Sequence, residues 1–229
     1  MDFANRTVIV TGGTGALGRA VVGTLLDAGA HCRIPYVVEA EAASFPHQDR
    51  VTLVGHCELT NETDVARLYA GATDLWASIH IAGGFAMGSI EDTDKSGMLD
   101  MLNTNFVTCY LCCRAAVQNF GPGGGRIVNV AARPGVEPRL GAGMAPYAAS
   151  KAAVAAFTQA LAAEVARGGI LVNAVAPSVI DTPANRAAMP KADHAAWPKP
   201  VEIAATIAFL ASPDNKVTTG AVVPVPGPT

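Results

Sequence analysis

With 229 residues, 50% hydrophobic and 15% charged, the chain is long enough to bury a substantial core, and its length favours one domain. A formal net charge of −3 and no run of like charges argue against nucleic acid or an anionic membrane as partners, which leaves small molecules. No apolar stretch reaches the roughly 18 residues that a membrane span needs, and the N-terminal apolar run is too short for a signal peptide, so we expect a cytoplasmic protein.

Short β-rich runs alternate with Ala-rich helical segments along the chain. In chain order, strands are expected at 6–12, 31–37, 50–55, 75–84, 125–131, 169–177 and 220–227. Helices are expected between them, at 16–28, 38–45, 61–71, 95–119, 146–167 and 201–211. The run 170–176 is apolar without strict alternation, as a strand buried on both faces should be. This order predicts one doubly wound α/β domain over residues 1–229, with about seven mostly parallel strands and helices on both faces.

A glycine-rich turn, "TGGTGALG" at 11–18, follows the first strand and opens the first helix. Glycines there permit a tight turn and a close approach of pyrophosphate, while the first amides of the helix point at the anion. The spacing of Gly12, Gly15 and Gly18 differs from the usual GxGxxG, so the spacing alone does not settle the matter. The flanking strand and helix supply the context that the motif requires. We predict dinucleotide contacts from Gly12, Thr14, Gly15, Ala16, Leu17 and Gly18.

The end of the second strand normally distinguishes NAD from NADP, because an acid there binds the adenosine ribose and repels an added phosphate. Tyr36 stands where that acid is expected, while Glu39 and Glu41 come later, in the next turn or helix. Arg33 lies on the strand and either faces a 2′-phosphate or is a surface charge. We therefore place Arg33 and Tyr36 at the cofactor site and expect NADPH or NADH, with a slight preference for NADPH.

Three of the five cysteines, Cys109, Cys112 and Cys113, share one face of the helix expected at 95–119. They resemble metal ligands, but no histidine or fourth cysteine follows at ligand spacing. Packing in the core is therefore the favoured interpretation, and no metal site is predicted. The lack of a secretory signal also favours reduced thiols.

Tyr147 and Lys151 are four residues apart near the start of the helix expected at 146–167, so they lie on one helix face. A nearby ammonium favours the phenolate and lowers the pKa of a tyrosine from about 10, which makes the tyrosine a usable acid or base. This spacing is common by chance in helices. Together with a glycine turn on a parallel sheet, it becomes a strong signal for a catalytic pair.

These motifs resemble the short-chain dehydrogenases/reductases over essentially the whole chain. The matching segments are "TGGTGALG" (11–18), "IAGG" (81–84), "NTNF" (103–106), "RIVNVA" (126–131), "YAASK" (147–151) and "VNAVAPSVIDTP" (172–183). The resemblance implies a Rossmann-type fold and hydride transfer to or from a nicotinamide. It further implies that Tyr147 donates the proton, that Lys151 tunes Tyr147 and holds the nicotinamide ribose, and that Asn105 anchors a water of the proton relay. Cofactor contacts are implied for Glu58, Leu59, Ala82, Gly83, Gly84, Pro177, Val179 and Thr182.

One position departs from the family pattern. The family usually carries a serine that hydrogen-bonds the substrate carbonyl where this chain has Ala132, and no Ser or Thr occurs between Asn129 and Tyr147. Three interpretations are open: the chain binds a cofactor without catalysis, another donor such as water or Arg133 replaces the serine, or the substrate needs no serine.

The third interpretation is the most specific, because the chain is similar to the dihydropteridine reductase branch, which also lacks this serine. The similar segments are "GGTGALG" (12–18), "VVE" (37–39), "AGGF" (82–85) and, above all, "DTPANRAAMPKADHAAW" (181–197). A quinonoid dihydropterin spreads its acceptor character over a conjugated ring system, so Tyr147 could suffice as the donor. Tyr36 in place of that branch's aspartate, and the presence of Asn105, suggest a relative with a shifted substrate.

We therefore expect an NAD(P)H-dependent reductase with a short substrate loop at 181–200. A carbonyl or alcohol oxidoreductase and a non-catalytic NAD(P)-binding protein are the alternatives. Phe85 or Trp197 either forms an aromatic wall for the substrate or packs in the core, and a structural role is favoured for His194. The resemblance also implies a homodimer or homotetramer built through the helices at 95–119 and 146–167.

Overall fold

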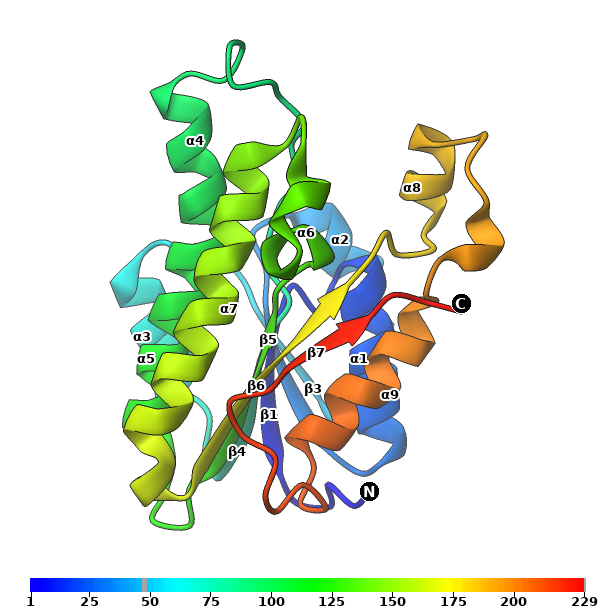
Figure 1. Ribbon diagram of the computed structural model, residues 1–229. Helices are drawn as coiled ribbons and strands as arrows, with labels where there is room; N and C mark the ends of the chain where they lie inside the picture. The colour runs from blue at the N-terminus through cyan, green and yellow to red at the C-terminus, as the bar shows by residue number, and fades with distance from the viewer. Residues whose placement is uncertain (47–48, 229) are drawn as a thin grey trace.

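The structure is a computed structural model that describes residues 1–46 and 49–228 (Figure 1). Its centre is a seven-stranded sheet in which every pairing is parallel, in the order β3-β2-β1-β4-β5-β6-β7. The strands are β1 (Thr7–Thr11), β2 (His31–Pro35), β3 (Val51–Val54), β4 (Leu75–His80), β5 (Gly125–Val130), β6 (Ile170–Pro177) and β7 (Val222–Val225). The predicted fold class is confirmed, and each of the seven strands lies within its predicted range.

Helices cover both faces of the sheet (Figure 1). The α-helices are α1 (Ala16–Asp27), α2 (Glu39–Ala43), α3 (Glu62–Ala70), α4 (Lys95–Leu102), α5 (Thr108–Asn119), α6 (Arg133–Val136), α7 (Ala145–Val165), α8 (Pro183–Ala188) and α9 (Pro200–Ala211). Buried side chains of α3, α5 and α7 form one core with the sheet, and those of α1 and α9 form the second core on the other face. Strands between two such cores are mostly apolar on both sides, which explains why their hydrophobic residues do not alternate strictly with polar ones.

The helix expected at 95–119 is interrupted. Lys95–Leu102 and Thr108–Asn119 are α-helical, but Asn103–Val107 forms a π-helical turn between them. This wider turn contains Asn105, and single π-turns inside helices are frequent at functional sites. Helices α6 and α8 were not expected, because four and six residues are too few to show a helical hydrophobic period.

The order of the strands creates a crevice at one edge of the sheet. From β1 the chain passes outward to β2 and β3, then returns to the other side of β1 to form β4, with Thr11 opposite His80. Ligands of open α/β sheets bind outside the carboxyl ends of the strands at such a switch point. The glycine turn follows β1 and the "IAGG" segment follows β4, so both lie at this edge. In the described part of the chain, no helix is long and apolar enough to cross a bilayer.

Candidate functional site

The glycine turn at 11–18 forms a cradle of bare backbone at the start of α1. Gly12 has φ +66°, and a Cβ there would lie 2.7 Å from the amide nitrogen of Ala82. A Cβ on Gly18 would overlap the carbonyl oxygen of Gly12 and lie 2.6 Å from the Cα of Gly13. Gly15 is the N-cap of α1, and no side chain caps the helix. The first amides of α1 are therefore available to an anion, which fits the pyrophosphate of a dinucleotide.

The segment after β2 brings an acid to this turn. The hydroxyl of Thr14 donates to Glu41 at 2.6 Å, although Glu41 lies on α2. Arg19 reinforces the contact by donating from Nε to the carbonyl oxygen of Thr14 at 2.8 Å and from Nη2 to that of Glu41 at 3.2 Å. Tyr36 is half-buried, and its ring packs over Gly55, where a Cβ would lie 2.8 Å from the phenol oxygen. Sequence reasoning did not place Glu41 beside the turn, because a contact across 27 residues has no local signal.

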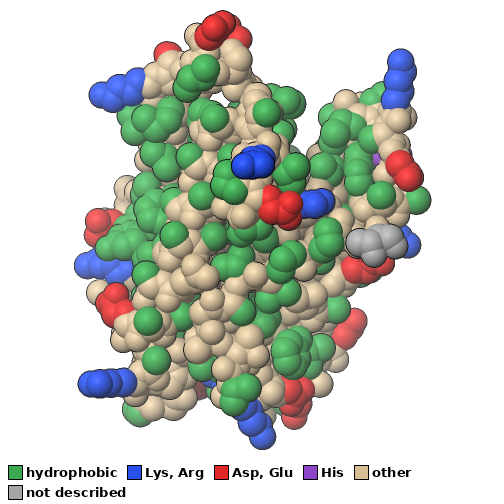
Figure 2. Space-filling view, in the orientation of Figure 1, with side chains coloured by type: hydrophobic (Ala, Val, Ile, Leu, Met, Phe, Trp, Pro, Cys, Tyr) green, Lys and Arg blue, Asp and Glu red, His purple; other side chains and the backbone are tan. Residues whose placement is uncertain are grey.

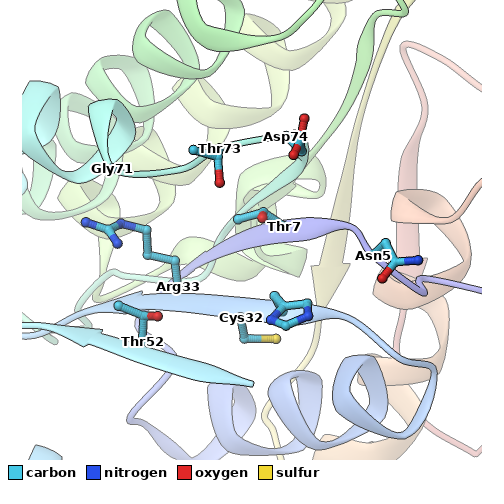
Figure 3. Close-up of a pocket in the computed structure, with 9 residues that line it drawn as sticks. Asn5, Thr7, Cys32, Arg33, Thr52, Gly71, Thr73 and Asp74 are labelled. Atoms are coloured by element: carbon cyan, nitrogen blue, oxygen red, sulfur yellow. The ribbon is translucent and has the colours of Figure 1, made fainter. Parts of the chain in front are cut away.

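Arg33 points in another direction. Its Nε donates to the carbonyl oxygen of Leu68 at 2.9 Å, and its guanidinium lies against Gly71 at the end of α3. It lines a polar cavity of about 360 Å³ together with Thr7, Thr52 and Asp74 (Figure 3). Thr7 begins β1 and Asp74 precedes β4, so the cavity lies toward the amino-terminal edge of the sheet. The structure therefore does not bring Arg33 to the glycine turn. Its contacts fit the alternative of a surface charge, which here also caps the end of α3.

The remaining predicted cofactor residues follow the carboxyl ends of β3, β4 and β6. Glu58 and Leu59 lie between β3 and α3, with Leu59 buried and Glu58 exposed. Pro177 ends β6, Val179 is exposed just beyond it, and the hydroxyl of Thr182 caps α8 by accepting from the amide of Asn185 at 3.2 Å. Ala82, Gly83 and Gly84 complete this group after β4. The strand ends of a parallel sheet thus gather residues that are distant in the sequence.

Asn105 and Lys151 converge on Gly83. A Cβ on Gly83 would lie 2.6 Å from Asn105 Oδ1 and 3.2 Å from Lys151 Nζ. Asn105 is held on both sides: Oδ1 accepts from the amide of Gly84 at 3.0 Å, and Nδ2 donates to the carbonyl oxygen of Gly84 at 3.0 Å and to Ser150 Oγ at 3.1 Å. Lys151 Nζ donates to the carbonyl oxygen of Val130 at 2.9 Å. Ser150, which the sequence did not single out, thus helps to orient Asn105.

Burial dominates the titration of the Tyr147–Lys151 pair. Burial raises the pKa of Tyr147 to about 12 and lowers the pKa of Lys151 to about 8. The prediction that Lys151 lowers the Tyr147 pKa is therefore wrong for this structure. The physical reason is that the ammonium is directed at Val130, so desolvation of the phenolate prevails. Tyr147 is consequently protonated at neutral pH and can give up a proton.

Tyr147 contacts an exposed aromatic ring. Its ring makes an edge-to-face contact with Phe85 at a centroid distance of 4.9 Å, and Phe85 is 59% exposed. The buried Ala132, where the sequence lacks a serine, lies two residues beyond the end of β5 and is the N-cap residue of α6. Arg133, considered as a replacement donor, instead pairs with Glu137 at 3.0 Å. Figure 2 shows that the surface is hollowed between the part of the molecule that carries α6 and the loop that carries α8.

The loop at 181–200 is organised by its own contacts. Asp181 and Arg186 form an ion pair at 2.5 Å, and the hydrogen bond from Arg186 holds the pKa of Asp181 below its usual value. Trp197 is buried and lies 4.6 Å from the ring of His194, whose Nε2 is 2.9 Å from the carbonyl oxygen of Met189. These contacts fit structural roles for Trp197 and His194. Of the two candidate aromatic walls, Phe85 is the one beside Tyr147.

Comparison with known proteins places this geometry in a family. The model of the short chain dehydrogenase family matches residues 6–193. Carbonyl reductase family member 4 of Danio rerio is 31% identical over 236 residues, which cover 97% of this chain and 97% of that protein. A solved short chain dehydrogenase/reductase family protein superposes with a TM-score of 0.88 at 30% identity, covering 98% of this chain and 97% of the other.

A second solved structure bears on the cofactor. A blue fluorescent protein from a metagenomic library, in complex with NADPH, superposes with a TM-score of 0.85 at 26% identity, covering 99% of this chain and 98% of the other. The uncapped start of α1 and the glycine cradle suit the phosphates of such a cofactor. Together with the family match, these findings show that the chain belongs to the short-chain dehydrogenases/reductases and is an NAD(P)-dependent oxidoreductase.

Proposed function

We propose that this enzyme transfers hydride from NADPH or NADH to a conjugated small-molecule acceptor, and that a quinonoid dihydropterin is the leading candidate. The nicotinamide, when bound, supplies the hydride. Tyr147 supplies the proton from its hydroxyl, and Lys151 holds the nicotinamide ribose. Asn105, fixed by Gly84 and Ser150, anchors the water that resupplies Tyr147.

Two observations carry the proposal: the aromatic contact of Tyr147 and the missing serine. The protonated phenol of Tyr147 contacts the exposed ring of Phe85, and the position where the family carries its serine holds the buried methyl group of Ala132. A lone ketone in such a site has one hydrogen-bond donor instead of two as negative charge develops on its oxygen. A planar conjugated acceptor spreads that charge and stacks well on an aromatic side chain. The site therefore favours a flat acceptor that needs a single proton.

The pterin assignment is tested by initial rates of NADH and NADPH oxidation with chemically generated quinonoid dihydropterin, beside a panel of simple ketones. We expect the pterin to be reduced at least about tenfold faster than any ketone, which corresponds to about 1.4 kcal/mol of extra transition-state stabilisation. Equal or faster turnover of the ketones would move the assignment to a carbonyl reductase. The same assay compares the two cofactors directly, and the slight preference for NADPH predicts the faster rate with NADPH.

A carbonyl or alcohol substrate is the second candidate, and it is favoured by the relatives. One is the Danio rerio carbonyl reductase family member already described, and another is a 3beta-hydroxysteroid dehydrogenase of Mediterraneibacter gnavus, 29% identical over 260 residues. These names belong to those proteins. For this chain, the two candidates differ in what a restored serine would do.

Ala132→Ser is expected to leave the pterin rate within about threefold and to raise ketone reduction by about tenfold or more, because a second donor stabilises a localised oxyanion. Both rates are measured as kcat/KM with the same enzyme preparation. Ala131→Ser, at the adjacent buried position, is the matched control and should raise neither rate. If Ala132→Ser raised pterin and ketone reduction equally, the proposal of an acceptor that needs no serine would be wrong.

We also propose that the enzyme forms a homodimer or homotetramer through α4, α5 and α7. Leu99 and Tyr110, on α4 and α5, remain 40% and 43% exposed in the single chain. Large apolar side chains exposed on neighbouring helices are typical of a protein–protein interface. Sedimentation equilibrium of the purified enzyme gives its assembly state.

A further inference from the structure

A histidine and two cysteines meet in the core beside α5, outside the proposed catalytic residues. His80 ends β4, and Cys109 and Cys113 lie one turn apart on α5. All three are buried, and one ligand atom from each lies within 4.8 Å of the other two. Cys113 Sγ is 3.4 Å from His80 Nδ1. The five cysteines of the chain are all free, so these thiols are not used in disulfides.

The distances between these ligand atoms suit a small metal ion with tetrahedral coordination. Zinc lies about 2.3 Å from thiolate sulfur and about 2.0–2.1 Å from imidazole nitrogen, so tetrahedral angles place two ligand atoms about 3.5–3.8 Å apart. The observed Nδ1 to Sγ distance of 3.4 Å is already close to that value.

Neighbouring polar groups orient the imidazole as a ligand. His80 Nε2 is 2.8 Å from Ser78 Oγ and 3.2 Å from the Tyr69 hydroxyl. An ion bound at Nδ1 requires the ring proton on Nε2, and these two oxygens can accept it there. A ligating histidine almost always donates its other ring N–H in this way. Ser78 and Tyr69 therefore offer acceptors for the tautomer that metal binding needs.

Asn129 offers a fourth donor atom, an amide oxygen, beside the cluster. Its Nδ2 donates to Thr158 Oγ1 at 2.9 Å, which turns Oδ1 toward the cluster. Oδ1 accepts hydrogen bonds from His80 Nδ1 at 2.8 Å and from Cys113 Sγ at 3.4 Å, and metal binding would replace these two hydrogen bonds. Two sulfurs, one nitrogen and one oxygen suit a borderline-soft ion such as zinc better than magnesium or calcium, which prefer oxygen ligands.

The charge balance also favours a dication here. Binding would release one proton from each thiol to solvent, so a dication with two thiolates leaves the buried site with no net charge. Cys112, on the same helix, is also buried but is not part of this cluster.

We propose that His80, Cys109 and Cys113, with Asn129 Oδ1, form a structural zinc site that joins β4 and β5 to α5. The sequence favoured packing for these cysteines because their histidine is on another element, far outside ligand spacing. The site is distinct from the proposed catalytic residues, since none of its members is among them.

The test measures metal content and a spectrum, not activity. The protein is produced in zinc-supplemented medium, passed through gel filtration, and analysed for zinc per chain. We expect about one zinc per chain in the wild type and in Cys112→Ala, and less than about a tenth in Cys109→Ala and Cys113→Ala. Cys112 is the matched control because it is a buried cysteine on the same helix. Circular dichroism shows whether each variant is folded.

Cobalt binding to the wild type decides the matter if a variant fails to fold. After removal of zinc, Co²⁺ should give intense tetrahedral d–d bands and a near-ultraviolet thiolate charge-transfer band, both displaced by added Zn²⁺. Wild-type protein without zinc and without these bands would overturn the proposal. Full zinc content in folded Cys109→Ala and Cys113→Ala would overturn it as well, because the metal would then lie elsewhere.

Discussion

Replacing Tyr147 with phenylalanine is expected to lower kcat by about 10²–10⁴-fold and to leave cofactor affinity near that of the wild type. The change removes one hydroxyl and keeps the ring, so the edge-to-face contact with Phe85 at 4.9 Å is preserved. Because burial raises the Tyr147 pKa to about 12, the hydroxyl is protonated throughout the neutral range and acts as the donor. Single-turnover oxidation of NAD(P)H separates this loss in chemistry from a loss in binding.

Tyr110→Phe is the matched control for this substitution. Tyr110 lies on α5, is 43% exposed and contacts Phe106 and Phe157. The Tyr110→Phe variant also loses one phenol hydroxyl, but away from the proposed proton donor. Its kcat should stay within about twofold of the wild type. If Tyr147→Phe kept wild-type turnover, another group would have to supply the proton and the proposed role of Tyr147 would fall.

Gly18→Ala is expected to abolish cofactor binding and to lower the free energy of unfolding by about 1–3 kcal/mol. The added methyl group would overlap the carbonyl oxygen of Gly12 and lie 2.6 Å from the Cα of Gly13. Both contacts are with backbone, which cannot rotate away as a side chain can. The turn must therefore open, and the amides that face the pyrophosphate are displaced. Titration of cofactor fluorescence and urea denaturation measure the two effects separately.

Gly23→Ala, five residues farther along α1, is expected to give the opposite outcome. A Cβ at Gly23 meets nothing within 4 Å, so the substitution relieves only the entropic cost of glycine in a helix. It should raise the free energy of unfolding by about 0.4–1 kcal/mol with cofactor affinity unchanged. Equal behaviour of Gly18→Ala and Gly23→Ala would show that the close packing at Gly18 has no functional consequence.

Most of the fold could be predicted because local patterns report it. The strand from Ile170 to Pro177 is apolar except at Asn173 since it lies between two cores, and its place in the α/β alternation follows from its flanking helices. The π-helical turn at Asn103–Val107 could not be predicted, because it interrupts a helix whose side-chain pattern continues across it. Helix α8 could not be predicted either, because six residues are too few to show a helical hydrophobic period.

The candidate site was only partly visible from the sequence. Tyr147 and Lys151 are local partners on one helix, so their spacing revealed them. The contacts and the burial of the two side chains could not be predicted. Lys151 donates to the carbonyl oxygen of Val130, and burial, not the ammonium, sets the pKa of Tyr147. Ser150 orients Asn105 across 45 residues, a contact that no spacing rule describes.

The sequence by itself determined the alternation of strands and helices, the glycine turn, the Tyr147–Lys151 pair and the loss of serine at Ala132, because each depends on neighbours within one or two elements. Only the tertiary structure decided where long side chains point. Arg33 turns toward Leu68, Glu41 reaches Thr14, and His80 joins Cys109 and Cys113. These contacts form when a parallel sheet brings distant strands and helices side by side, and local sequence periodicity carries no record of that pairing.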